Sequence, residues 1–406
     1  MRPLAAPPQP RPNLLSPCFL ASPAAGAPPI SAVIEAGGVA DAVRHMTDTG
    51  RPRLQFEALW IVTNVASGST EQTQAVVDAG AVPVLVRLLS SPVADIREQA
   101  AWCIGNIAGD SPALRDMLLA SGVTTAMPTI MAVDGQPLSL QRNCTWACSN
   151  LVRGKPAPDL ERVRPLIPAL ARCMLSDDEE VLSDACWGLS YLSDGSNDRI
   201  AAVLACGVAT RLVEVMDSLS QKVMVPALRT LGNIVTGSDD QTDEVVRAGG
   251  IQAFHAALDS EKQSVVKEAC WALSNVTAGS RVQIQCVIDT GCFAKLVTIS
   301  EGGRMGPDVL KEASWVLCNA FAGGSAEQAA EIVGTGALCV VAAALREAPD
   351  RGVTRVTLDG LADGARSGGI TATTLVNAGL MGTIEGLANG NDSTCAAAAG
   401  AVLEAI

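Results

Sequence analysis

Six tryptophans occur in similar surroundings along the chain, and their neighbours include residue types that bind cations. They are Trp60, Trp102, Trp146, Trp187, Trp271 and Trp315. A polar or acidic residue lies three positions before each, and asparagine lies four positions after every one but Trp187, as in Gln99, Trp102 and Asn106. An indole face attracts a cation, a carboxylate pairs with one, and a carboxamide both donates and accepts hydrogen bonds. This combination predicts a surface that holds an extended peptide rich in Lys or Arg.

The spacing of the tryptophans indicates that the chain is built from repeats. Their steps are 42, 44, 41, 84 and 44 residues, and Arg229 in ALRTLGN stands where the double step would place another aromatic. Glycines preceded by a small residue recur with the same period, at Gly37, Gly80, Gly122, Gly207, Gly249, Gly291, Gly336 and Gly379. Such glycines are typical of helix ends in the left-handed conformation. We expect an all-α, armadillo-repeat, right-handed superhelical solenoid of about nine repeats, the first and last incomplete.

The helix around Trp102 separates an apolar stripe from a polar one. At about 100 degrees per residue, Ala100, Ile104 and Ile107 lie on the side away from Trp102 and form the predicted core. A single tryptophan on a helix is often only a packing residue. Six in register, each with polar partners, favour a binding surface instead, and we call these tryptophans and their asparagines the ladder.

The dimensions of the ladder suit an extended peptide. Packed helices lie about 8 to 10 Å apart and a peptide advances about 3.4 Å per residue, so one repeat matches roughly three peptide residues. Asn side chains would hold the peptide backbone, and rim acids such as Asp110 and Asp184 would meet Lys or Arg. Tyr191 in place of Asn and Arg229 in place of Trp interrupt the ladder. Two sites, and a ligand with two basic clusters joined by a linker, are therefore predicted.

Composition excludes several other functions. With 29 basic and 42 acidic residues the net charge is −13, which disfavours direct nucleic-acid binding and suits a cationic partner, although acidity can also serve solubility alone. Thirteen Cys and two His show no metal-binding spacing, so no metal or cofactor is expected and the cysteines are predicted to be reduced. No apolar run is long enough to cross a membrane. No catalytic constellation is found, so the chain is not predicted to be an enzyme.

Several segments resemble the importin-α (karyopherin-α) family of nuclear import adaptors. They include WIVTNVASGSTEQTQAVVDAGAVPVLVRLL, WCIGNIAGDSP, WACSNLVRGKPAPDL, ACWGLSYLSDG, LRTLGNIVTGSDDQT and KEACWALSNVTAG, and the resemblance runs from about residue 31 to the C-terminus. It implies that the chain binds mono- and bipartite nuclear localisation signals on cargo proteins, and that it works in the cytoplasm and nucleus. It also implies two sets of contact residues. The major site comprises Trp60, Asn64, Ser67, Gly68, Thr73, Gln99, Trp102, Asn106, Asp110, Trp146, Asn150 and Asp184. The minor site comprises Asn233, Asp239, Glu268, Trp271, Asn275, Glu312, Trp315 and Asn319.

The N-terminal segment departs from the family pattern. The family begins with a basic importin-β-binding segment, whereas residues 1–30 contain only Arg2 and Arg11 as basic residues. We expect 1–30 to be a disordered Pro-rich leader and 31–406 to be the armadillo domain. Importin-β is a partner expected from the family although its binding segment is not seen. A chain that sequesters cargo without recruiting importin-β, and an armadillo scaffold for another peptide partner, are the alternatives.

Overall fold

The computed structural model describes residues 30–218, 220–347 and 351–406, so the predicted leader lies outside it except for Ile30. Within these ranges all regular structure is helical, and the 27 helices form nine sets of three. The first helices are α1 (Ile30–Glu35), α4 (Thr70–Asp78), α7 (Pro112–Leu119), α10 (Leu160–Val163), α13 (Asn197–Leu204), α16 (Asp239–Arg247), α19 (Arg281–Asp289), α22 (Ala326–Gly334) and α25 (Ala372–Asn377). The second helices are α2 (Gly38–His45), α5 (Ala81–Leu88), α8 (Val123–Met131), α11 (Leu166–Cys173), α14 (Ala209–Met216), α17 (Gly250–Ala257), α20 (Cys292–Glu301), α23 (Leu338–Glu347) and α26 (Met381–Ala388).

The long third helices carry the ladder. They are α3 (Pro52–Ala66), α6 (Ala94–Asp110), α9 (Leu138–Leu151), α12 (Glu179–Ser193), α15 (Gln221–Ile234), α18 (Gln263–Thr277), α21 (Pro307–Gly323), α24 (Arg351–Arg366) and α27 (Ser393–Ala405). The number of repeats agrees with the prediction of about nine. The expectation of incomplete terminal repeats is wrong, because the first and last sets each have three helices, although α1 and α25 contain only six residues.

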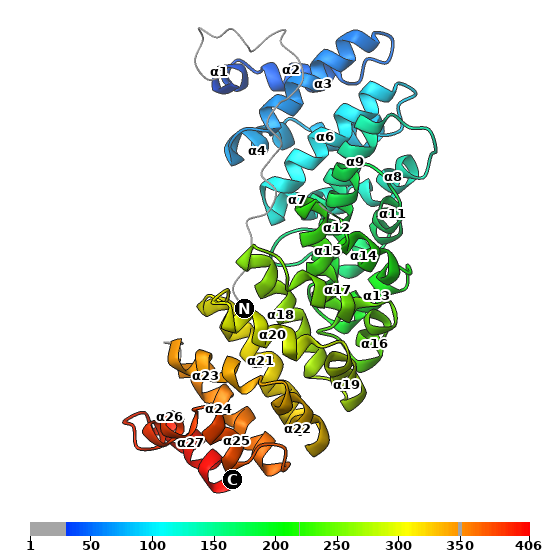
Figure 1. The fold of residues 1–406 in the computed structure, drawn as a ribbon. Helices are drawn as coiled ribbons and strands as arrows, with labels where there is room; N and C mark the ends of the chain where they lie inside the picture. Colours follow the sequence, from blue (N-terminus) through cyan, green and yellow to red (C-terminus); the bar gives the residue numbers. More distant parts are fainter. Residues whose placement is uncertain (1–29, 219, 348–350) are drawn as a thin grey trace. The chain divides into compact units, whose positions relative to one another are not determined.

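The described part of the chain divides into two compact units, with the boundary between Leu192 and Ser193. In the first unit the long helices α3, α6 and α9 pack in sequence order (Figure 1). In the second unit α15, α18, α21, α24 and α27 do the same. All predicted major-site residues fall in the first unit and all predicted minor-site residues in the second.

The predicted core and turns are confirmed. Ala100, Ile104 and Ile107 are 0% exposed, as the helical periodicity of α6 requires. The eight periodic glycines all have positive φ, between 68° and 91°. At Gly80 a Cβ atom would meet nothing within 4 Å, so the left-handed backbone, rather than lack of space, is what favours glycine there.

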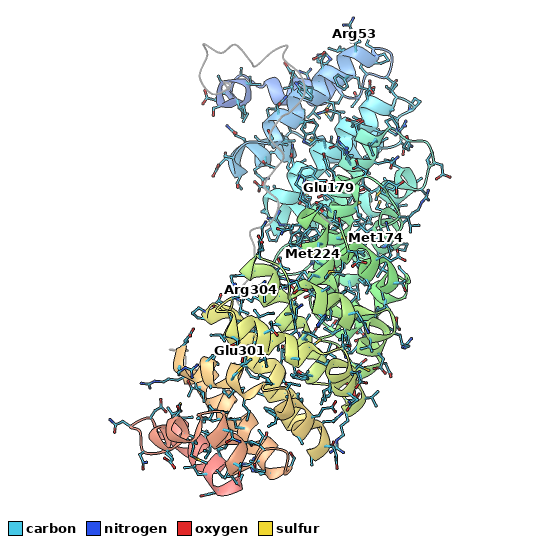
Figure 2. All side chains as sticks on the ribbon, in the orientation of Figure 1. Arg53, Met174, Glu179, Met224, Glu301 and Arg304 are labelled. Carbon is cyan, nitrogen blue, oxygen red and sulfur yellow. The ribbon has the colours of Figure 1, made fainter. Side chains whose placement is uncertain are left out.

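Two kinds of polar contact connect successive repeats in the second unit. Ser238, Ser280 and Ser325 begin first helices with capping boxes, and the glutamine of each box also reaches the preceding first helix. Gln283 Nε2 donates to the Asp239 carbonyl at 2.9 Å. The second kind involves the segments between second and third helices. Arg304, labelled in Figure 2, lies between α20 and α21 and donates to the Asp259 and Ser260 carbonyls, between α17 and α18, at 3.1 Å. These bonds fix the packing of neighbouring repeats.

Candidate functional site

Three ladder tryptophans lie on adjacent long helices of the first unit. Trp60 on α3 and Trp102 on α6 are half-buried, and their rings meet edge to face with centroids 5.8 Å apart. Trp146 on α9 differs, because it is only 2% exposed. Its ring packs against Gly105 of α6. The expectation that all ladder indoles stand in an open surface is therefore wrong for Trp146, whose role in peptide binding stays a prediction.

The ladder asparagines of this unit already make hydrogen bonds within the chain. Asn106 Nδ2 donates to the Thr63 carbonyl at 3.3 Å, and Asn150 Nδ2 donates to the Gly105 carbonyl at 3.1 Å. Each of these bonds joins a long helix to the long helix before it. Asn64 donates to the Trp60 carbonyl of its own helix at 2.9 Å. A carboxamide has two N–H donors and one acceptor oxygen, so a bond to a neighbouring carbonyl orients the amide without using all of its hydrogen-bonding capacity.

Three polar atoms on α6 are buried without a hydrogen-bond partner in the structure. They are one acceptor, Asp110 Oδ2, and two donors, Gln99 Nε2 and Arg97 Nε. Asp110 is also the last residue of α6, where the helix dipole adds negative potential to that of its carboxylate. Buried polar groups are nearly always paired, and an unpaired one lowers stability. The unpaired Asp110 oxygen and the helix dipole therefore both favour a cation at the C-terminal end of α6.

The other predicted major-site residues lie in the α3–α4 turn and on α12. Ser67 and Gly68 are exposed in the turn, while Thr73 is 1% exposed and donates to the Ala66 and Ser69 carbonyls within 3.2 Å. Helix α4 contacts both α3 and α6, which ends at Asp110. On α12, Asp184 is 6% exposed, so most of the contact surface predicted for it is covered.

The second unit carries further ladder residues, on α15, α18 and α21. Trp271 and Trp315 are half-buried. Asn319 Nδ2 donates to the Ser274 carbonyl at 2.8 Å, again from one long helix to the one before it. Asn275 donates to the Trp271 carbonyl at 3.0 Å, and Asn233 donates to Ser193 Oγ at 3.3 Å.

Arg229, which interrupts the ladder in the sequence, contacts the ladder residue Trp271 and the acid Glu268, both on α18. Its guanidinium donates through Nη2 to Glu268 Oε2 at 2.8 Å and through Nε to Glu268 Oε1. Its Cζ atom lies over the Trp271 ring, 5.8 Å from the centroid. The Glu268 side chain is 6% exposed. Glu268, predicted as a ligand contact, thus already has a cationic partner within the chain.

Glu312 on α21 is the acid of the minor site with a perturbed pKa. Burial raises the pKa of this carboxyl above its usual range, while Lys311 and Lys267 oppose the rise and Glu268 and Asp308 add to it. A cation supplied by a ligand would oppose the effect of burial and lower the pKa.

A small cavity brings two predicted minor-site residues together with six residues that sequence reasoning missed. It measures about 130 Å³ and is lined by Asp239, Asn275, Val235, Thr236, Gly237, Thr242, Ala278 and Gly279. A signal for them exists in the sequence, since GSDDQT at 237–242 repeats the GSTEQT at 68–73 that contains Gly68 and Thr73. The volume of this cavity is enough for the end of one side chain.

Other kinds of site are not seen in the described ranges. There, no group of His, Cys, Asp or Glu is arranged to hold a metal, and no cysteine forms a disulfide. Burial raises the pKa of Cys103 to about 12, so its thiol is a packing group at neutral pH. No single described helix is long and apolar enough to span a membrane. Two pairs of consecutive helices reach that length and composition only when the two helices of a pair are taken together, and each pair is bent. A larger cavity of about 380 Å³ beside α24 and α27 contains no ladder residue.

Comparison with known proteins supports the repeat architecture and identifies relatives. Residues 69–109, 164–194 and 238–278 match the Armadillo/beta-catenin-like repeat. Importin subunit alpha-1b of Oryza sativa subsp. japonica is 52% identical over 204 residues, which are 50% of this chain and 38% of that protein. Importin subunit alpha-2 of Arabidopsis thaliana is 51% identical over 193 residues, 48% of this chain and 36% of that protein. The matched segment thus spans less than two fifths of either relative.

A solved structure matches over most of the chain. The crystal structure of an engineered protein superposes with a TM-score of 0.82 at 29% identity and covers 93% of this chain and 90% of its own. Together with the repeat match, this establishes the armadillo-repeat fold.

Proposed function

We propose, from the premise that this armadillo-repeat chain belongs to the importin-α family, that it binds extended Lys/Arg-rich peptides through its ladder and acts as a nuclear import adaptor. Its ligands are mono- and bipartite nuclear localisation signals of cargo proteins. The major site lies in the first unit and the minor site in the second.

The unpaired oxygen of Asp110 carries this proposal. Asp110 Oδ2 is buried without a hydrogen-bond partner at the C-terminal end of α6. A lysine ammonium of a bound peptide would pair with this oxygen and neutralise the carboxylate. An acidic or apolar peptide would leave Asp110 Oδ2 unpaired, so the same group that favours Lys disfavours those ligands.

The contacts of Arg229 support the proposed chemistry independently. The chain's own guanidinium lies over the Trp271 indole while it pairs with Glu268. A guanidinium between an indole face and a carboxylate is the arrangement proposed for a ligand arginine, and this protein stabilises it internally. Trp60, Trp102 and Trp315 are half-buried, so part of each residue remains accessible to a ligand cation.

The wider cellular role follows from the relatives. Those named above are importin subunits, so cargo and importin-β are the partners proposed for this chain, which would work in both cytoplasm and nucleus. The chain is proposed to have no enzymatic activity. Co-purification with importin-β tests recruitment, and peptide binding without importin-β binding would favour the alternative of a cargo-sequestering chain.

Fluorescence-anisotropy titration of a labelled KKKRK-type peptide tests the proposal. An acidic peptide of equal length is the ligand control, and Asp95→Lys is the matched variant, because Asp95 is exposed on the same helix. We expect selective binding of the basic peptide, loss with Asp110→Lys, and near-normal binding with Asp95→Lys. Preference for the acidic peptide would contradict the proposal and favour an armadillo scaffold for another partner.

A further inference from the structure

We infer that Gly105 and Gly232 are positioning residues for the two peptide sites, because each one leaves the space that a ladder indole of the next long helix occupies. This inference rests on the proposed function. It concerns two residues that lie beside the ladder and hold ladder side chains in place.

Gly105 of α6 lies directly against the indole of Trp146. A Cβ atom at Gly105 would stand 2.2 Å from Trp146 Cζ3 and 2.6 Å from Cε3, far inside van der Waals contact. The indole is rigid and Trp146 is 2% exposed, so the ring cannot make room by bending and is enclosed by neighbours. Any side chain at position 105 must therefore displace the ring.

Gly105 also orients the asparagine that accompanies Trp146. Its carbonyl accepts the Asn150 Nδ2 hydrogen bond at 3.1 Å. One residue of α6 thus fixes both ladder groups of α9, the indole through the space that the absence of a Cβ leaves and the carboxamide through its carbonyl oxygen. A displaced indole would shift the α9 backbone between Trp146 and Asn150 and weaken this bond.

Gly232 has the same relationship to Trp271 in the second unit. A Cβ atom at Gly232 would stand 2.4 Å from Trp271 Cζ3 and 3.0 Å from Cε3. The same ring also contacts the guanidinium of Arg229, three residues earlier on α15. Helix α15 therefore sets the place of the first minor-site indole through two residues.

Glycine is not a general requirement at this position of the long helices. The residues three positions after the ladder aromatic or Arg229 are Thr63, Gly105, Ser149, Ser190, Gly232, Ser274 and Cys318. Glycine is a poor helix former, and both glycines lie in helix interiors, so their presence needs a packing reason. The close approach of Trp146 and Trp271 supplies that reason.

Gly105→Ala, Gly232→Ala and the control Gly188→Ala test this inference. A Cβ atom at Gly188 would stand 2.8 Å from Leu170 Cδ1 in the core, so this variant overpacks a long helix against a leucine and not against the indole of the next long helix. Affinities for a single-cluster and a two-cluster basic peptide are measured by anisotropy at a temperature where circular dichroism shows each variant to be folded. Acrylamide quenching of tryptophan emission reports ring exposure without any peptide.

The two glycines should affect different ligands. Gly105→Ala should weaken the single-cluster peptide by about tenfold or more, since overpacking displaces the ring of the major site. Gly232→Ala should leave that affinity unchanged and remove the extra affinity of the two-cluster peptide. Both variants should show stronger acrylamide quenching, whereas Gly188→Ala should lower Tm with unchanged affinities and quenching.

The outcomes separate this inference from the proposed function. Absence of basic-peptide binding by the unmodified chain would overturn the proposed function and, with it, the role of the glycines in binding. Normal binding by the unmodified chain, together with unchanged affinities and quenching in Gly105→Ala and Gly232→Ala, would overturn only the inference. Equal loss of affinity in Gly188→Ala would also overturn it, because general destabilisation would then explain the effect.

Discussion

The guanidinium of Arg229 lies over the indole of Trp271, with Cζ 5.8 Å from the ring centroid, and it also donates hydrogen bonds to both carboxylate oxygens of Glu268. From sequence alone, Arg229 is a gap in the ladder. In the structure it is a cation that the chain supplies to its own indole and carboxylate. The predicted minor site therefore contains an internal ion pair, in which Glu268 is the partner of Arg229.

Removal of Arg229 should destabilise the second unit. The Glu268 side chain is 6% exposed, so Arg229→Ala leaves a buried carboxylate without its partner. Breaking a buried pair in this way costs about 3 kcal/mol, and the 24% exposure of Arg229 places the expected value at the low end of the usual range. Urea unfolding followed by circular dichroism measures the loss. The double variant Arg229→Leu, Glu268→Leu should recover much of it, and a double variant less stable than Arg229→Ala would contradict this account.

Binding at the minor site should depend on pH through Glu312. Burial raises the pKa of this carboxyl, so acidification from neutral pH protonates Glu312 earlier than an ordinary glutamate. A ligand arginine pairs with the ionised form, so affinity for a two-cluster peptide should fall over this range more than affinity for a single-cluster peptide. Glu312→Gln should remove most of this difference. An equal pH dependence in the variant would show that another group is responsible.

Folding stability should depend on the charge of Glu312 in the opposite direction from ligand binding, because folding favours the protonated carboxyl and the ligand favours the ionised one. The folded chain binds the Glu312 proton more tightly than the unfolded chain, so its contribution to stability is lost as pH rises from the ordinary pKa of 4.5 through the raised folded value. Glu312→Gln should therefore increase the free energy of unfolding at pH 7, and the increase should vanish below pH 4.5. Thermal unfolding at a series of pH values tests this, and a gain that persists at low pH would contradict it.

Gln283 should contribute to the packing of repeats in the second unit. It is 1% exposed, and its amide accepts from Ser280 N–H and donates to the Asp239 carbonyl and to Asp243 Oδ1. Gln283→Leu leaves these groups without that partner and should cost about 2 kcal/mol. Gln72→Leu is the matched control, because Gln72 occupies the same capping-box position with only a 3.5 Å bond to the preceding first helix. Equal losses in the two variants would assign the effect to the capping box alone.

The repeat and its core could be predicted from sequence because both depend on local periodicity. The left-handed glycines such as Gly80 and the buried face of Ala100, Ile104 and Ile107 follow from a spacing of about 42 residues and from the 3.6-residue turn. These features are set within one repeat, where the residues that interact are close in sequence.

The details of the ladder could not be predicted because they depend on how one long helix packs on the next. The burial of Trp146 requires Gly105 to face it from a helix 41 residues earlier, and the bonds of Asn106 and Asn319 require carbonyls on the preceding long helix. A helical wheel gives directions within one helix but not the offset between two. For the same reason the family resemblance predicts Glu268 as a ligand contact without revealing its pairing with Arg229.

A double-mutant cycle between Asp110 and the lysines of a single-cluster peptide tests the central claim most directly. The unmodified chain and Asp110→Ala are titrated with the peptide and with variants in which each Lys in turn is replaced by norleucine. The account predicts that one lysine position loses at least about tenfold affinity with the unmodified chain and much less with Asp110→Ala, since this lysine pairs with the unsatisfied Oδ2. Additive losses at every lysine position would contradict it.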